Sequence, residues 1–128
     1  MKILLIDDDP AIKYLTRIIL TQKHQECSIA DVSNGEEAIA LITSGLILPD
    51  IILLDWEMPK MNGLEFLQTY SALNLHRNDV LLYILTTTVD DYLTDCVTNF
   101  SVVKGLFEKP LNGDHMAQII SDLAIGAG

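Results

Sequence analysis

Five short apolar runs recur along the chain, and each one stops at a polar residue. Because the runs are nearly unbroken rather than alternating, they favour strands that are buried on both faces of a parallel sheet. We expect these strands at residues 2–6, 27–32, 51–54, 80–85 and 102–107. Each run is followed by a segment with apolar residues at helical spacing, so the chain is predicted to contain five strand–helix units.

The segments between the runs carry helix signals. Asp9 is placed to cap a helix that Pro10 begins, and Ser33-Asn34-Gly35-Glu36 resembles a capping box. The apolar faces expected for the first and last helices are Ala11, Tyr14, Leu15, Ile18 and Ile19, and Met116, Ile119, Ile120 and Leu123. The helix expected from about residue 90 to 100 is poorer in aliphatic residues, which indicates weaker anchoring.

Repeating strand and helix predicts an α/β fold, a doubly wound parallel sheet with right-handed crossovers and helices on both faces. The functional crevice of such a sheet lies at the carboxyl ends of its strands. The polar residues found at those ends are Asp7, Asp8, Asp55, Thr86 and Lys109. We therefore expect four separate segments to bring these side chains to one edge of the sheet.

Three carboxylates gathered at one place repel one another unless a cation or a proton compensates them. Oxygen ligands of this kind suit Mg²⁺, which binds one or two carboxylates together with a phosphoryl oxygen. Asp55 could then attack an activated phosphoryl group, with Lys109 and Thr86 neutralising its oxygens. Taken singly, the aspartates could be a solvated helix cap, the threonine a turn hydroxyl and the lysine a surface charge; the constellation favours the phosphoryl chemistry.

Length and charge narrow the function further. The chain has 128 residues, enough for one domain, and its net charge of −10 opposes binding to nucleic acid by this domain alone. The apolar start of the chain is too short for a signal peptide or a membrane span, so we expect no membrane association and a cytoplasmic location. Cys27 and Cys96 lack metal-ligand spacing and are expected to be reduced and partly buried.

The segments KILLIDDDP (2–10), LLDWEMPKMNG (53–63), LTT (85–87) and Lys109-Pro110 together resemble the signature of response-regulator receiver domains. The resemblance spans essentially the whole chain, so we expect a single receiver domain over 1–128. It implies a flavodoxin-like (βα)₅ sheet with strand order 2-1-3-4-5. It also implies a phosphorelay switch, not a turnover enzyme, that accepts a phosphoryl group from a phosphohistidine donor.

The resemblance assigns a role to each site residue. Asp55 would be the phosphoacceptor, Thr86 the switch hydroxyl and Lys109 the partner of the phosphoryl group, with a cis Lys109-Pro110 bond. Mg²⁺ or Mn²⁺ would be held by Asp7, Asp8, Asp55 and the backbone carbonyl of Glu57, and the backbone of Trp56 and Thr87 would contact the phosphoryl group. The implied partners are a sensor histidine kinase or phosphotransfer protein, a downstream protein target and, on phosphorylation, a second copy of the chain.

Leu106 departs from the family, because relatives usually carry an aromatic residue at this position. Phe107 is one place along and, since side chains alternate along a strand, must face the other side of the sheet. The usual coupling between threonine and aromatic residue is therefore in question. Leu111 also stands where many relatives have phenylalanine. Glu57 and Thr88 are expected at the mouth of the site, where Glu57 would add negative charge and raise dependence on the metal.

Three alternatives remain at this point. A receiver-like binding scaffold that works without phosphorylation would share the fold. A haloacid-dehalogenase-like phosphatase also uses an aspartate nucleophile with Mg²⁺, but it needs a second aspartate where this chain has Glu57. A flavodoxin-like cofactor binder needs a hydroxyl-rich phosphate loop after the first strand, where three aspartates would repel the phosphate.

Overall fold

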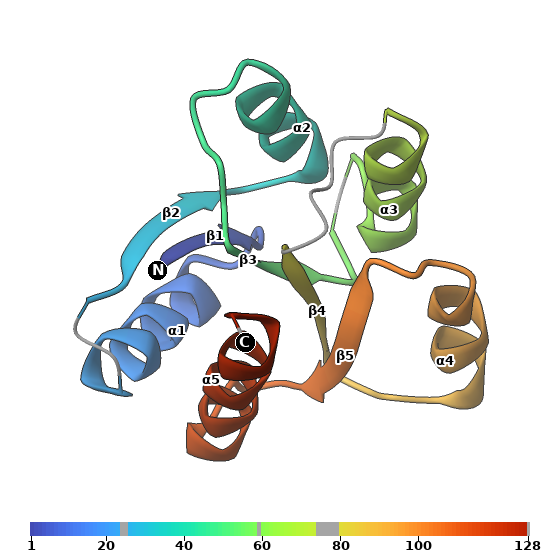
Figure 1. Ribbon diagram of the computed structural model, residues 1–128. Helices are drawn as coiled ribbons and strands as arrows, with labels where there is room; N and C mark the ends of the chain where they lie inside the picture. Colours follow the sequence, from blue (N-terminus) through green and yellow to red (C-terminus); the bar gives the residue numbers. More distant parts are fainter. Residues whose placement is uncertain (24–25, 59, 74–79, 128) are drawn as a thin grey trace.

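A computed structural model describes residues 1–23, 26–58, 60–73 and 80–127. A single sheet of five parallel strands runs through the middle of the molecule in the order β2-β1-β3-β4-β5 (Figure 1). The strands are β1 (Lys2–Ile6), β2 (Ser28–Val32), β3 (Ile51–Asp55), β4 (Leu81–Thr86) and β5 (Val103–Glu108). The predicted fold class and strand order are confirmed, and the strand ends differ from those predicted by at most one residue.

Five helices cover the two faces of this sheet. They are α1 (Pro10–Lys23), α2 (Gly35–Thr43), α3 (Gly63–Ala72), α4 (Asp91–Thr98) and α5 (Gly113–Ala127). α1 and α5 lie together on one face, and α2, α3 and α4 lie on the other (Figure 1). No helix in the described part of the chain is long and apolar enough to cross a membrane.

The sheet is buried on both faces, as the unbroken apolar runs predicted. One core cluster, containing Leu4, Leu54 and Phe66, packs under α2, α3 and α4. The second cluster, containing Leu53 and Met116, packs under α1 and α5. All five residues of β3 are buried, because β3 is the central strand and helices cover it on both sides. A rigid central strand of this kind fixes the position of Asp55, its last residue.

The exposed side of α1 is not the one that we predicted. Tyr14 and Leu15 are 66% and 50% exposed, whereas Thr16 and Leu20 are buried against the sheet. α1 is apolar on more than one side, so periodicity alone could not decide which side faces the core. The result is an apolar patch on the surface of α1, made of Tyr14 and Leu15.

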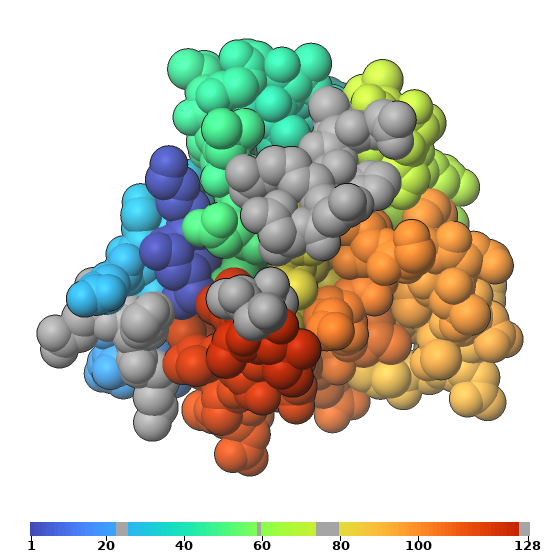
Figure 2. Space-filling view, viewed as in Figure 1, coloured from blue at the N-terminus to red at the C-terminus, as the bar shows by residue number. Residues whose placement is uncertain are grey.

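Two smaller predictions about helices are also corrected. α2 is capped by Asn34, whose side chain accepts from the Glu37 N–H, rather than by Ser33, whose hydroxyl instead accepts from Lys13 Nζ at 3.1 Å. In α5, Ile120 was expected on the apolar face but is 40% exposed. Asp122 is buried on that face instead, because its carboxylate accepts a hydrogen bond from the Tyr83 hydroxyl beneath it. Figure 2 shows α5 on the surface of the molecule next to β5, with α4 on the other side of β5.

Candidate functional site

The polar residues at the strand ends meet at one edge of the sheet. Asp7 follows β1, Asp55 ends β3, Thr86 ends β4 and Lys109 follows β5. Carboxylate oxygens of Asp7, Asp8 and Asp55 all lie within 4.8 Å of one another. Asp7 and Asp55 are buried and Asp8 is exposed, so the acidic cluster opens to solvent on the side of Asp8.

Lys109 is the positive charge inside this cluster. Its Nζ donates to Asp55 Oδ1 at 2.8 Å and lies 3.3 Å from Asp7 Oδ2. The Lys109–Pro110 peptide bond is cis, as the resemblance implied. One lysine therefore faces two buried carboxylates, and the cluster keeps a surplus of negative charge.

Asp7 is incompletely satisfied in the described part of the chain. Its Oδ1 accepts from the Asp9 N–H at 2.9 Å, but its buried Oδ2 accepts no hydrogen bond there, despite its closeness to Lys109. A buried carboxylate oxygen without a donor is costly unless a cation binds it. The donor set of three carboxylates around that oxygen fits a hard divalent ion.

The electrostatics of Asp55 follow from this crowding. The pKa of Asp55 is raised to about 6, chiefly by burial; the hydrogen bond from Lys109 opposes this rise, and the Asp7 carboxylate adds to it. Burial alone would lower the pKa of Lys109, but Asp55 and Asp7 outweigh that effect and raise it. The ionised form of Asp55 is thus disfavoured in the metal-free site, and a second cation would favour it.

The two loops beside Asp55 are joined by hydrogen bonds. The Thr87 hydroxyl of the β4–α4 loop donates to Glu57 Oε1 of the β3–α3 loop at 3.1 Å. The Thr86 hydroxyl donates to the Thr88 carbonyl at 3.1 Å, so it points into its own loop. The Thr87–Glu57 bond was not predictable from the sequence, because no sequence pattern encodes a contact between two loops.

The backbone around Asp55 offers one N–H group that faces the carboxylate. The Glu57 N–H donates to Asp55 Oδ1 at 3.2 Å, whereas the Trp56 N–H donates to the Leu85 carbonyl at 3.0 Å. A phosphoryl contact from Trp56, as the resemblance implied, would require that second bond to open. The Glu57 N–H is already directed at the Asp55 carboxylate.

A cavity of about 390 Å³ adjoins the acidic cluster through Trp56 and Glu57. Its lining residues are Trp56, Glu57, Met58, Asn62, Leu64 and Tyr92, from the β3–α3 loop, α3 and α4. Gly63 shapes this wall, since a Cβ atom there would lie 2.6 Å from Trp56 Cε3. Trp56 is therefore held against the α3 backbone at the edge of the site.

Leu106 and Phe107 face opposite sides of the sheet, as predicted. Leu106 packs against the cluster under α2–α4, and Phe107 is buried in the cluster under α1 and α5. Phe107 therefore cannot replace an aromatic side chain at position 106. Leu111, also singled out in the sequence, is buried beside Phe107. The two cysteines are both free and half-buried, which confirms that prediction.

Comparison with known proteins agrees with this geometry. Residues 3–121 match the family model described as response regulator receiver domain. The nitrate/nitrite response regulator protein NarL of Escherichia coli K12 is 35% identical over 96 residues, which cover 75% of this chain and 41% of that protein. The transcriptional regulatory protein YdfI of Bacillus subtilis 168 is 32% identical over 92 residues, covering 72% of this chain and 40% of that protein.

Solved structures share the whole fold. A two-component response regulator from Legionella pneumophila superposes with a TM-score of 0.86 at 22% identity, covering 98% of both chains. The bacteriophytochrome response regulator AtBRR superposes with a TM-score of 0.79 at 26% identity, covering 97% of this chain and 92% of that one. The chain spans less than half the length of the two curated relatives named above. It belongs to the response regulator receiver domain family of two-component systems.

Proposed function

We propose that Asp55 accepts a phosphoryl group from a phosphohistidine donor in a reaction that depends on Mg²⁺ or Mn²⁺. The observation that carries this proposal is the buried Asp55–Lys109 pair beside Asp7, whose Oδ2 accepts no hydrogen bond among the described residues. Family membership sets aside the dehalogenase-like and flavodoxin-like alternatives. The phosphorylation-independent scaffold is the alternative that the experiments below must exclude.

The protein ligands of the metal would be Asp7, Asp8, Asp55 and the backbone carbonyl of Glu57. The ion would supply charge neutralisation for the carboxylates and for one phosphoryl oxygen. Asp7 Oδ2 is the atom for which such an ion matters most, because it is buried and accepts no hydrogen bond from the described residues. Asp8 is exposed and could hold the ion through a water molecule.

In the transfer step an Asp55 oxygen attacks phosphorus, a new P–O bond forms and the P–N bond to the donor histidine breaks. The electron pair of that P–N bond stays on the imidazole, which takes up a proton. Lys109 would move from Asp55 Oδ1 toward the transferred phosphoryl oxygens, and the Glu57 and Thr87 N–H groups would donate to them. Thr86 would turn its hydroxyl from the Thr88 carbonyl toward the phosphoryl group, which couples the chemistry to the β4–α4 loop.

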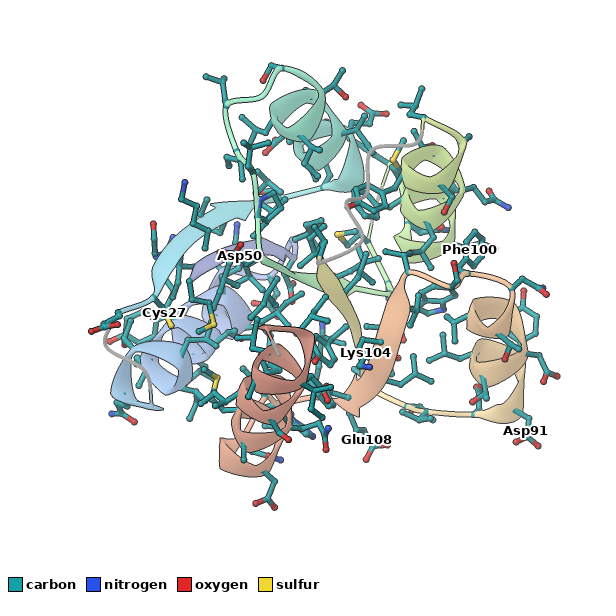
Figure 3. All side chains as sticks on the ribbon, in the orientation of Figure 1. Cys27, Asp50, Asp91, Phe100, Lys104 and Glu108 are labelled. Carbon is teal, nitrogen blue, oxygen red and sulfur yellow. The ribbon has the colours of Figure 1, made fainter. Side chains whose placement is uncertain are left out.

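Two surfaces are proposed for protein partners. α1 begins directly after the acidic cluster and carries the exposed Tyr14 and Leu15, so a helical phosphodonor could dock there with its histidine over Asp55. The output surface would be α4, β5 and α5, where the side chains of Lys104 and Glu108 project from the edge strand β5 (Figure 3). A downstream protein, or a second copy of the chain after phosphorylation, would bind this surface. Nucleic acid is not an expected partner, given the net charge of −10.

The fluorescence of Trp56 provides the test, because it is the chain's single tryptophan and adjoins Asp55. Mg²⁺ is titrated first, and beryllium fluoride is then added as a phosphoryl mimic. We expect two successive changes in wild type, a changed metal response and no beryllium-fluoride response in Asp55→Asn, and wild-type behaviour in Asp95→Asn, an exposed carboxylate on α4. A flat wild-type signal in both steps would refute the proposed site and favour the scaffold alternative.

A second measurement addresses the transfer itself. Phosphoramidate, a small donor with a P–N bond, is mixed with the protein and the intact mass is recorded with and without Mg²⁺. We expect a mass gain of one phosphoryl group that requires Mg²⁺ and is absent in Asp55→Asn. A gain of equal size in Asp55→Asn would place the acceptor elsewhere.

A further inference from the structure

A reciprocal pair of hydrogen bonds closes the N-terminus of α5. The His115 N–H donates to Asn112 Oδ1 at 3.0 Å, and the Asn112 N–H donates to His115 Nδ1 at 3.2 Å. This is a capping box in which histidine stands where glutamate or glutamine is usual. Unlike those side chains, an imidazole gains a proton close to neutral pH. The cap of α5 therefore depends on an acceptor atom, His115 Nδ1, that can no longer accept a hydrogen bond once it is protonated.

The imidazole is held in place by an aromatic stack. Its ring lies 4.4 Å from the Phe107 ring at an interplanar angle of 14°, and Phe107 stacks in turn on Tyr83 at 4.9 Å and 10°. The Tyr83 hydroxyl donates to Asp122, which also accepts from Gln118 Nε2 at 2.9 Å. β4, β5 and α5 thus fix the plane of the ring. A half-turn about the Cβ–Cγ bond keeps that plane, so the hydrogen bond from the Asn112 N–H is what selects the orientation with Nδ1 toward Asn112.

Protonation would turn the acceptor into a donor. Neutral imidazole can accept at Nδ1, but the imidazolium carries N–H groups at both nitrogens and would place one of them against the Asn112 N–H. The new positive charge would also sit at a helix N-terminus, where the helix dipole disfavours it. Burial lowers the pKa of His115, and the neighbouring Asp114 offsets part of this effect.

The other charged groups of the elements packed around His115 are directed away from its ring. On α1, which packs against α5, Lys13 and Arg17 are paired with Asp31. On α5, Asp122 is bonded to Tyr83 and Gln118. On β5, Glu108 is exposed and adjacent to Phe107 in the strand, so it faces the opposite side of the sheet. Lys109 is directed at Asp55 and Asp7. Asp114 is thus the charge described here that acts on the imidazole.

We propose that His115 is a pH-sensitive cap, which holds the first turn of α5 when neutral and releases it when protonated. Asn112 is three residues after Lys109, and Leu111 between them is buried under α5. Release of the cap would loosen the segment that presents Lys109 to the acidic cluster. The His115 cap responds to proton concentration, and it does so whether or not Asp55 is phosphorylated.

The direction of the effect follows from the lowered pKa. The folded protein binds fewer protons at His115 than the unfolded chain does, so this contribution to stability is complete above 6.5, the ordinary pKa of histidine, and is lost as the pH falls below it. Asp55 titrates in the same range with the opposite effect on stability. The experiment is therefore done in Asp55→Asn, which removes that second titration.

Amide hydrogen exchange and proton NMR are recorded from pH 7.5 to pH 5 for Asp55→Asn and for Asp55→Asn/His115→Gln. Glutamine keeps the capping acceptor but does not titrate, so it serves as the matched control. We expect a histidine signal, absent from the double variant, that titrates below 6.5. We also expect the Asn112, His115 and Met116 amides of the single variant to lose about five-fold of their protection, after correction for intrinsic exchange, as one helix cap is lost.

Each result of the NMR and exchange measurements either supports or overturns the pH-sensitive cap. Loss of protection that follows the His115 titration in the single variant, with constant protection in the double variant, supports the proposal. A titration at or above 6.5, unchanged protection once His115 is protonated, or the same loss in the double variant overturns it. If the double variant does not fold, comparison of the titration and the exchange curve within the single variant gives the answer alone.

Discussion

Replacement of Asp55 by asparagine should stabilise the metal-free protein at neutral pH. In the folded chain the ionised Asp55 is buried beside Asp7, and its pKa is raised from 3.8 to about 6. A shift of about 2 pKa units corresponds to a cost of about 3 kcal/mol for keeping Asp55 ionised at pH 7. This cost is already net of the favourable hydrogen bond from Lys109, so removal of the charge by asparagine should give a gain of up to about 3 kcal/mol.

The sign of the pH dependence follows from the same shift. Between pH 3.8 and about 6 the native state binds more protons at Asp55 than the unfolded state does, so the contribution of Asp55 to wild-type stability falls as the pH rises through this window. Asp55→Asn lacks this slope. The stability difference between the two proteins should therefore be small near pH 4 and should grow until about pH 7, where Asp55 is ionised in both states of the wild type.

Urea unfolding in EDTA, followed by Trp56 fluorescence and by circular dichroism from pH 4.5 to pH 7.5, measures this difference. His115 does not contact Asp55 and is shared by the two proteins, so its contribution cancels in the comparison. Addition of Mg²⁺ should reduce the gap, because the ion compensates Asp55 in the wild type. A variant that is less stable than wild type at pH 7 without metal, or a gap that shrinks as the pH rises, would refute the argument.

Three further results are expected. Asp8→Asn should weaken Mg²⁺ binding by about ten-fold or more, as seen in a Trp56 fluorescence titration, with little change in urea stability because Asp8 is exposed. Gly63→Ala should destabilise the protein by about 1–3 kcal/mol, since the added Cβ would lie 2.9 Å from the Trp56 backbone, and an unchanged urea midpoint would contradict this contact. Tyr83→Phe should cost about 1–3 kcal/mol because it removes a donor from the buried Asp122, and equal stability of the two proteins would mean that the bond contributes nothing.

The parts of the site that the sequence predicted are those set by the geometry of parallel strands. Asp55 and Lys109 lie 54 positions apart in the chain, yet they make a direct hydrogen bond because both stand at carboxyl ends of strands in one sheet. Apolar runs mark where strands end, and a parallel sheet brings those ends to one edge. The acidic cluster was therefore predictable. The lack of a hydrogen bond to Asp7 Oδ2 from the described residues was not, since it depends on side-chain rotamers.

Contacts that depend on loops or on the rotation of a helix were not predictable in this way. The Thr87–Glu57 hydrogen bond joins two loops, and the exposed side of α1 depends on which of its apolar sides packs on the sheet. The burial of Asp122 was not predicted for a related reason. A carboxylate next to apolar helix positions is expected to face solvent unless a buried donor is known, and here that donor is Tyr83 of a distant strand. Local periodicity contains no information about partners from distant strands.

The position of Phe107 connects these observations. Alternation along β5 places Leu106 toward α4 and Phe107 toward α5, so the aromatic residue that β5 contributes lies on the α5 side of the sheet, opposite Trp56. The Phe107 ring stacks on two other rings. One belongs to Tyr83 of β4, and the other belongs to His115, which is part of the α5 cap. A displacement of Lys109 or of β5 would therefore be transmitted to the N-terminus of α5 through these packed rings, whereas on the α4 side the neighbouring position of β5 carries the aliphatic Leu106. Phosphorylation and proton uptake would then act on the same short segment, residues 109–115. Phosphorylation would act at Lys109, and proton uptake would act at His115.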